Sequence, residues 1–202
     1  MLTRSRPAAR PRGFSLIELM VTVSLLGVLV MLAMPSMAAW IRNNKVRTVA
    51  DALHNGLRVA QSEATRRSRQ VVFALTNSPT PATSLTAVVN GSYWAAKTVK
   101  LATGNTDAAD FIDSGTLNGT SSDVQIIGPV TICFSALGRM VTNTTPGVSG
   151  GSCDTASGTA QYDIKLDGPE ARPLRVLVSL GGQVRMCDPA KALSSTHPDG
   201  CP

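Results

Sequence analysis

Residues 12–37 read RGFSLIELMVTVSLLGVLVMLAMPSM, an apolar stretch of membrane-spanning length with one acidic residue, Glu18, near its start. Residues 19–34 contain no charged side chain, and about twenty apolar residues are enough for a helix to cross a bilayer. Residues 1–12 contain four arginines, the last of them Arg12, and no acidic residue. The positive-inside rule therefore predicts a cytoplasmic N-terminus and places the chain after Trp40 outside.

Three interpretations account for this stretch. It is an ordinary membrane anchor with Glu18 at the interface, or a secretory signal whose small-x-small cleavage site is Ser-Met-Ala at residues 36–38. The third rests on the segment GFSLIE at residues 13–18. This segment resembles the prepilin peptidase site of type IV pilins and type II secretion pseudopilins, and we favour this interpretation.

The resemblance implies a specific role for each marked residue. Prepilin peptidase would cleave between Gly13 and Phe14, and the new amine of Phe14 would be N-methylated. Glu18 would meet the N-terminal amine of a neighbouring subunit, which removes a penalty of roughly 2.5–3.5 kcal/mol for a carboxylate in hydrocarbon. Gly27 and Pro35 lie where pilin helices carry a flexible glycine and a kinking proline, so we expect a kink at Pro35.

The apolar pattern continues beyond the membrane-length stretch at three- and four-residue steps. The positions that form this stripe are Val46, Val49, Ala50, Leu53, Leu57 and Ala60. Such spacing is typical of a helix with one face packed on a domain. One helix over residues 14–68 is predicted, and the basic side chains of its second half are interpreted as a solvated face.

Residues after the helix indicate strands separated by polar loops. The predicted strands cover residues 70–75, 84–89, 93–101, 124–127, 130–134, 161–166, 173–179 and 183–187. Leu-Gly-Gly at residues 180–182 predicts a hairpin turn between the last two strands. The polar stretches 102–123 and 142–158 are predicted to be surface loops.

Three segments of the second half resemble the C-terminal part of the GspH/FimT family of minor pilins and pseudopilins. They are ICFSALGR at 132–139, LRVLV at 174–178 and GQVRMC at 182–187. The resemblance implies an α+β, type IV pilin-like fold with a long N-terminal helix packed on an antiparallel β-sheet domain. The expected organisation is a cleaved leader at 1–13, a transmembrane half-helix at 14–39, an amphipathic periplasmic half at 40–69 and a β-rich domain at 70–202.

The four cysteines, Cys133, Cys153, Cys187 and Cys201, include no Cys-x-x-Cys pair. An even number at wide spacing in an exported protein favours disulfides over metal ligation. Of the three pairings that four cysteines allow, we favour the sequential one, Cys133 with Cys153 and Cys187 with Cys201. Each of these bridges would close a loop rich in Gly, Pro or Ser.

The expected function is structural: a minor pilin or pseudopilin that primes or tips a type IV pilus or a type II secretion pseudopilus. Its expected location is the bacterial inner membrane, as a single-pass protein with a periplasmic C-terminal domain, and then the filament. Expected partners are prepilin peptidase, other pilins through the N-terminal helix, and inner-membrane lipid. We expect neither an enzyme nor a cofactor or metal site, because the chain has only two histidines.

DNA capture for uptake is the alternative function, since some FimT-like members carry a basic Gly-Arg-x-Arg motif near the C-terminus. Here residues 182–185 read GQVR, so the first arginine is missing. A phosphate-binding patch would need the nearby cations, which are Arg139, Arg172, Arg175, Arg185 and Lys191. The net charge of +6 gives little support, because four of the positive charges precede the apolar stretch.

Overall fold

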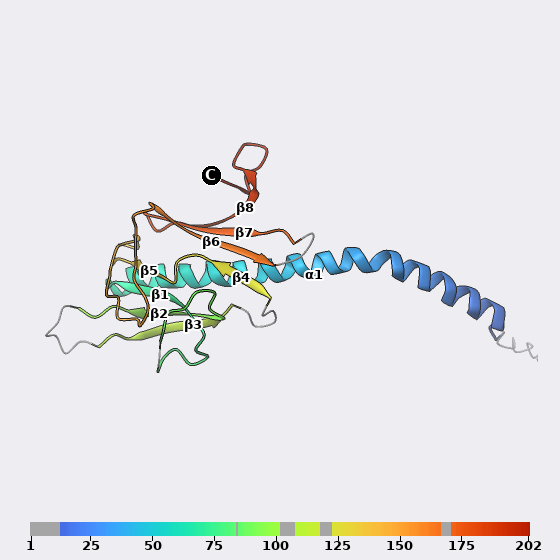
Figure 1. The fold of residues 1–202 in the computed structure, drawn as a ribbon, viewed down its shortest axis with the longest axis horizontal. Helices are drawn as coiled ribbons and strands as arrows, with labels where there is room; N and C mark the ends of the chain where they lie inside the picture. The colour runs from blue at the N-terminus through green and yellow to red at the C-terminus, as the bar shows by residue number, and fades with distance from the viewer. Residues whose placement is uncertain (1–12, 84, 102–107, 118–122, 167–170) are drawn as a thin grey trace, which may run out of the picture. The chain divides into compact units, whose positions relative to one another are not determined.

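The computed structural model describes residues 13–83, 85–101, 108–117, 123–166 and 171–202. The chain divides into two compact units, Met1–Trp40 and Ile41–Pro202. The boundary falls inside the long helix, so one part of the helix belongs to each unit. Figure 1 shows the fold with its helix and strands labelled.

Helix α1 runs over Leu16–Arg67, close to the predicted range of 14–68. Its last turn closes with the two hydrogen bonds of a Schellman motif: Ser68 N donates to Thr65 O at 3.2 Å, and Arg69 N donates to Ala64 O at 3.1 Å. Ser68 supplies the left-handed backbone that this motif needs, with φ of 51°. The helix therefore ends where the chain turns sharply into the first strand.

The first sheet contains four antiparallel strands in the order β3-β2-β1-β5. These strands are β1 (Val71–Thr76), β2 (Tyr93–Thr98), β3 (Phe111–Thr116) and β5 (Thr131–Phe134). Strand β1 lies inside this sheet between β2 and β5, and all its residues are buried. Such a strand reads as a continuous apolar run because both of its faces are covered.

The second sheet has five strands in the order β4-β6-β7-β8-β9. These strands are β4 (Val124–Ile127), β6 (Thr159–Leu166), β7 (Leu174–Ser179), β8 (Val184–Ala192) and β9 (Gly200–Cys201). All neighbours are antiparallel except β8 and β9, which pair in parallel. The predicted hairpin joins β7 to β8, where Gly182 N donates to Ser179 O at 2.8 Å and Gly182 has φ of +87°.

One strand prediction and one loop prediction were wrong. No strand forms over the described part of 84–89, where an isolated bridge joins Thr86 to Ser149. Conversely, β3 lies inside 102–123, which was predicted to be a loop. Its sequence FIDSGT does not alternate apolar and polar residues, and the strand forms because it pairs along β2. Strand β8 also extends beyond its predicted end, and β9 was not predicted.

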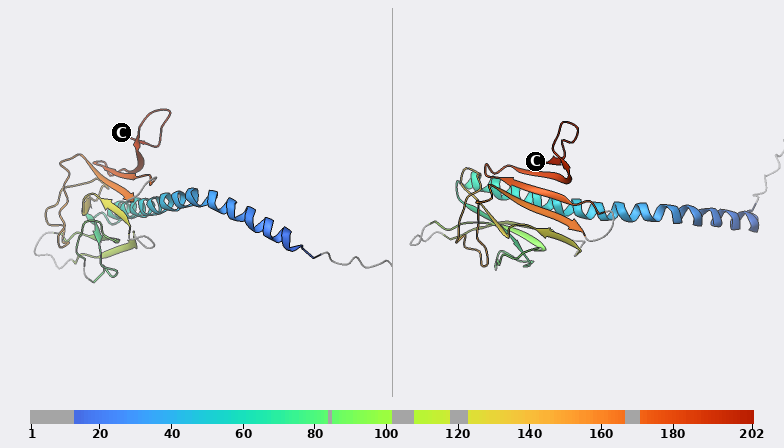
Figure 2. Two further views of the ribbon diagram at one scale, coloured as in Figure 1. Left: turned by 45° about the vertical axis from the view of Figure 1, so that its right-hand side comes forward. Right: turned by 45° about the horizontal axis from the view of Figure 1, so that its top comes forward.

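The core of the Ile41–Pro202 unit joins the helix to both sheets. One cluster of buried apolar residues contains the predicted stripe from Val46 to Ala60 together with residues of β1, β2, β5, β6 and β7. Within this unit, Figures 1 and 2 show β6 and β7 on one side of the helix and β1–β3 on the other. The stripe therefore packs on the β-rich domain as its spacing predicts.

A close backbone approach connects three elements at the end of α1. Gln61 Nε2 donates to Gly138 O at 3.2 Å, and Met140 N donates to Leu180 O at 3.0 Å. A Cβ added to Gly182 would lie 1.8 Å from Gly138 O. The helix, the turn after β5 and the β7–β8 hairpin therefore meet at a point that only glycine fits.

Candidate functional site

The N-terminal part of α1 begins with a capped first turn. Gly13, Phe14 and Ser15 precede the helix, and all three are exposed. Ser15 is the N-cap: its Oγ accepts a hydrogen bond from Glu18 N at 3.2 Å. Sequence reasoning missed this role, although Ser-x-x-Glu at residues 15–18 is the capping-box signature. The peptide bond between Gly13 and Phe14 lies outside the helix, where a protease could reach it.

Large apolar side chains of this half are uncovered in the single chain. From Phe14 to Trp40 they are 46–83% exposed. The helix is long and apolar enough to cross a membrane, judged by length and composition. It passes through Pro35 without a break in its assigned span, and the kink expected there stays a prediction.

The hydroxyl groups in the apolar half bond to the helix itself. Thr22 Oγ1 donates to Leu19 O at 2.9 Å, and Ser24 Oγ donates to Met20 O at 2.8 Å. Ser36 Oγ likewise donates to a carbonyl one turn earlier, at 2.9 Å. Among the described residues, none forms a hydrogen bond or an ion pair with the Glu18 carboxylate. Unlike these hydroxyl groups, the Glu18 carboxylate has no partner among the described residues, so a partner would have to come from elsewhere.

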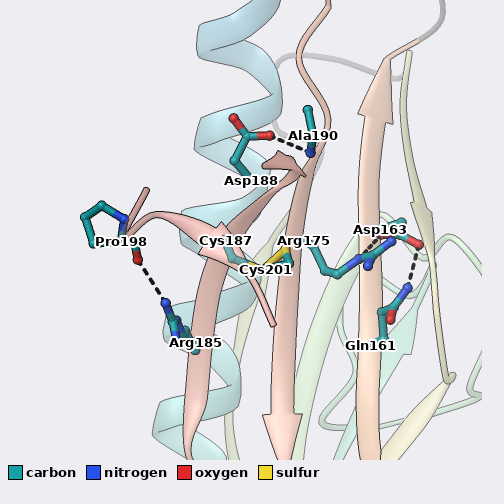
Figure 3. The surroundings of a disulfide bond; sticks show 9 residues. All are labelled: Gln161, Asp163, Arg175, Arg185, Cys187, Asp188, Ala190, Pro198 and Cys201. Carbon is teal, nitrogen blue, oxygen red and sulfur yellow. Dashed lines mark hydrogen bonds and ion pairs between the residues drawn. A yellow bond between two sulfur atoms is a disulfide. The ribbon is translucent and has the colours of Figure 1, made fainter. Parts of the chain in front are cut away.

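Both disulfides of the structure follow the sequential pairing. Cys133 of β5 bonds to Cys153 with a Cα–Cα distance of 5.6 Å, and Cys187 of β8 bonds to Cys201 of β9 at 5.1 Å. No cysteine is free. The first bridge belongs to a second, smaller cluster of buried apolar residues. The second bridge ties β9 to β8 (Figure 3).

Two of the candidate DNA-contacting cations share the outer face of β7 and β8 and have partners there. Arg175 Nε lies 2.6 Å from Oδ1 of Asp163. The second carboxylate oxygen of Asp163, Oδ2, accepts a hydrogen bond from Gln161 Nε2 at 3.0 Å. Arg185, opposite Leu177 in the register, donates to Pro198 O at 2.9 Å (Figure 3). Both guanidinium groups therefore already bind oxygen atoms of the same domain.

The other three candidates lie elsewhere. Arg139 follows β5 in the turn near the end of α1. Arg172 and Lys191 line a cavity beside the helix. Lys191 pairs with Asp199 at 2.5 Å, which raises the pKa of the lysine and lowers that of Asp199. The five cations therefore differ in their surroundings, and three of them have partners within the domain.

The described residues contain no group of three His, Cys, Asp or Glu side chains arranged to hold a metal ion. A buried phenol lies in the core of the domain. Tyr162 OH is fully buried without a hydrogen-bond partner among the described residues, and burial raises its pKa above the ordinary value. Tyr162 belongs to the main apolar cluster and does not line the cavity beside the helix.

Comparison with known proteins identifies two segments of the chain. The prokaryotic N-terminal methylation motif matches residues 9–34, and the model of type II transport protein GspH matches residues 49–182. No curated protein sequence matches the chain. The methylation motif covers the predicted cleavage site, Glu18 and most of the apolar stretch.

Two solved structures are similar in fold. Both are crystal structures of the type IV minor pilin FimU from Pseudomonas aeruginosa PAO1, and each is 15% identical to this chain. One has a TM-score of 0.49 and covers 74% of this chain and 92% of its own, and the other has 0.47 with 72% and 95%. No conclusion about function rests on a likeness at this level. The GspH model spans most of the β-rich domain and the helix that packs on it, so the chain belongs to the GspH family of pilin-like proteins.

Proposed function

We propose that the chain is a minor pilin or pseudopilin with a structural rather than a catalytic role. It primes or tips a filament, either a type IV pilus or a type II secretion pseudopilus. The observation that carries the proposal is the half-helix from Leu16 to Trp40. It is apolar, exposed in the single chain and internally hydrogen-bonded except at the Glu18 carboxylate. Such a surface needs a bilayer or neighbouring helices to cover it.

The proposed maturation follows from the methylation motif. Prepilin peptidase removes residues 1–13 by cutting between Gly13 and Phe14, and Phe14 is then N-methylated. Residues 14–39 anchor the chain in the inner membrane, and residues 40–69 and 70–202 form the periplasmic domain. The mass of the mature N-terminus tests this order: a chain that starts at methylated Phe14 supports it, and one that starts at Ala39 contradicts it.

Glu18 is the proposed assembly carboxylate. A neighbour's N-terminal ammonium would pair with it when the half-helices bundle, and assembly would be favoured because a carboxylate in hydrocarbon is costly when alone. We expect Glu18→Ala to be inserted and cleaved normally but to lose incorporation into filaments. Glu63→Ala is the matched control, because that carboxylate lies in the other half of α1. Normal incorporation of Glu18→Ala would contradict the proposed role.

The two kinds of filament are separated by deleting the gene. Loss of surface pili with normal exoprotein release assigns the chain to a type IV pilus, and the reverse result assigns it to a secretion pseudopilus. Unchanged piliation and unchanged secretion would contradict the structural proposal as a whole.

DNA capture is the weaker proposal. Three of its five cations already pair with Asp163, with Pro198 O and with Asp199. Phosphate contacts release counterions, so binding would weaken steeply with salt. If DNA capture is correct, the full chain binds duplex DNA at low salt and Arg185→Ala weakens the binding. No binding at low salt removes the proposal.

A further inference from the structure

A cavity of about 420 Å³ lies within the Ile41–Pro202 unit, between the first helical turns of that unit and the C-terminal strands. Its lining combines apolar side chains, such as Leu174 and Met186, with charged and amide side chains. The polar lining residues used below are Asn43, Arg47, Arg172, Asp188, Lys191 and Asp199. A cavity of this volume suits a small molecule or a headgroup rather than a protein segment.

One group of lining residues, Asn43, Arg47 and Arg172, is positive. Of the described residues, none pairs with the Arg172 guanidinium, which is exposed. Its backbone is held in place, because Arg172 N donates to Asn43 Oδ1 at 2.9 Å across 129 residues of sequence. Arg47 lies on the same helix as Asn43 and has a long ion pair of 3.9 Å with Asp51. This group can therefore offer guanidinium and amide donors to an anion.

A second group of lining residues, Asp188, Lys191 and Asp199, has a net negative charge. Asp188 and Asp199 share a single lysine, Lys191, at 3.7 Å and 2.5 Å, so one carboxylate charge stays uncompensated within this group. The hydrogen bond from Lys191 lowers the pKa of Asp199, which keeps that carboxylate ionised at neutral pH. Asp188 N also donates to Asp199 O at 2.7 Å. Asp188 directly follows Cys187, which is bonded to Cys201 (Figure 3).

This charge arrangement selects a ligand with both signs. A simple anion would be attracted by Arg172 and repelled by the aspartates. A simple cation would be attracted by the aspartates and repelled by Arg172. A molecule that carries a phosphate and an ammonium on a short linker satisfies both groups of lining residues. A primary ammonium fits better than a quaternary one, because it can donate hydrogen bonds to carboxylates.

The position of the cavity in the chain indicates where such a ligand would come from. Asn43 follows Trp40 by three residues, so the two are at most about 11 Å apart along the chain, whatever their geometry. Tryptophan is enriched at the membrane–water interface. With residues 14–39 in the bilayer, as proposed above, this short length of chain joins the interface to Asn43 in the cavity lining.

We propose that this cavity binds the headgroup of a zwitterionic phospholipid with a primary amine, of the phosphoethanolamine type. Arg172 and the Asn43 amide contact the phosphate, and Asp188 and Asp199 accept hydrogen bonds from the ammonium. The inference rests on the proposed membrane anchoring of residues 14–39.

Native mass spectrometry of the full chain released from lipid nanodiscs tests the proposal. Discs contain phosphatidylcholine alone or mixed with phosphatidylethanolamine or phosphatidylglycerol. We expect one phosphatidylethanolamine to be retained per chain. It should be preferred about tenfold over either other lipid, because one charge-assisted hydrogen bond supplies a ratio of about this size. Equal retention of phosphatidylglycerol would overturn the proposal, because it would indicate a general attraction to anions.

Matched variants locate the site. Arg172→Gln should reduce phosphatidylethanolamine retention to the level of phosphatidylcholine. Asp199→Asn should reduce it as well and shift the preference towards phosphatidylglycerol. Arg58→Gln removes an exposed arginine of the same helix that does not line the cavity, and it should retain the lipid. An equal loss in Arg58→Gln and Arg172→Gln contradicts the assigned site.

Failure of the lipid proposal is distinguishable from failure of the proposed function. A chain that does not enter the nanodisc contradicts both the membrane anchor and the lipid site. A chain that enters and shows no headgroup preference contradicts the lipid site alone, because filament assembly is measured separately in cells.

Discussion

The two parts of α1 differ both in apolar content and in what covers their apolar side chains. Between Leu16 and Trp40 the large apolar side chains cover all sides of the helix and are at least 46% exposed. Between Ile41 and Arg67 the apolar residues form one stripe, in which Val46, Leu53 and Leu57 are fully buried. A helix that is apolar on all sides needs a surrounding apolar phase, whereas a striped helix needs only one packed face. One continuous helix thus satisfies two different environments.

The largest expected effect contrasts one leucine from each part. Leu53→Ala should destabilise the domain by about 2–5 kcal/mol, because it leaves a cavity in the packed core. Leu26→Ala should leave domain stability unchanged, because Leu26 is 63% exposed. Chemical denaturation of the full chain in detergent, followed by the fluorescence of the buried Trp94, measures both. Equal losses in the two variants would contradict the division of α1 into two environments.

The second effect concerns the point where the packed part of α1 meets the β7–β8 hairpin. Gly182→Ala should cost about 1–3 kcal/mol from its left-handed backbone, and more from the approach of the new Cβ to Gly138 O. Gly181→Ala is the matched control: the nearest atom to its Cβ would be Ser179 Oγ at 3.8 Å. The same denaturation assay applies, and a tolerated Gly182→Ala would show that the hairpin can move away from the helix.

A smaller effect comes from the ion pairs at the end of α1. Hydrogen bonds from Arg66 and Arg67 lower the pKa of Glu63 from its ordinary 4.5 to about 2. Because the folded-state pKa is lowered, this stabilisation is complete above pH 4.5 and is lost as the pH falls towards 2. Glu63→Gln should cost about 0.5–1 kcal/mol at pH 7. The loss should disappear near pH 2.

Asp51→Asn is the control for Glu63→Gln, since its ion pair with Arg47 is long, at 3.9 Å, and exposed. It should change stability by less than Glu63→Gln does at pH 7. If the loss caused by Glu63→Gln were the same at pH 7 and pH 2, the charged pairs would not be its source.

The smallest effect concerns Tyr162 beneath the packed part of α1. Its buried hydroxyl has no partner among the described residues, so Tyr162→Phe should be neutral or stabilising by up to about 1 kcal/mol. Tyr93→Phe, at a half-buried position of β2, is the control. Thermal unfolding measures the sign. A clear loss in Tyr162→Phe would mean that the hydroxyl is hydrogen-bonded in solution.

Patterns local in sequence predicted the elements that depend on local chemistry. The stripe from Val46 to Ala60 predicted the packed helix, and Gly181-Gly182 predicted the β7–β8 turn. Strand β3 could not be predicted in this way, because FIDSGT has no alternation of its own. It depends on the antiparallel register with β2, which includes a bulge between Ala96 and Lys97.

The residues of the candidate site likewise include some that could be predicted from local sequence and some that could not. The cleavage segment and Glu18 lie within one short motif and were visible in the sequence. The partners of the C-terminal cations were not. Asp163 reaches Arg175 across the β6–β7 register, and Pro198 O reaches Arg185 from the returning tail. Pairings between distant residues follow from topology, so a count of cations in sequence overstated the charge available to DNA.

The bond between Cys187 and Cys201 has a consequence for the durability of β9. It closes a ring across 14 positions and ties β9 covalently to β8. If the few hydrogen bonds of β9 opened transiently, the strand would stay within reach of β8 and could pair again. A two-residue strand is thus kept at the edge of the sheet, although its own ladder is short.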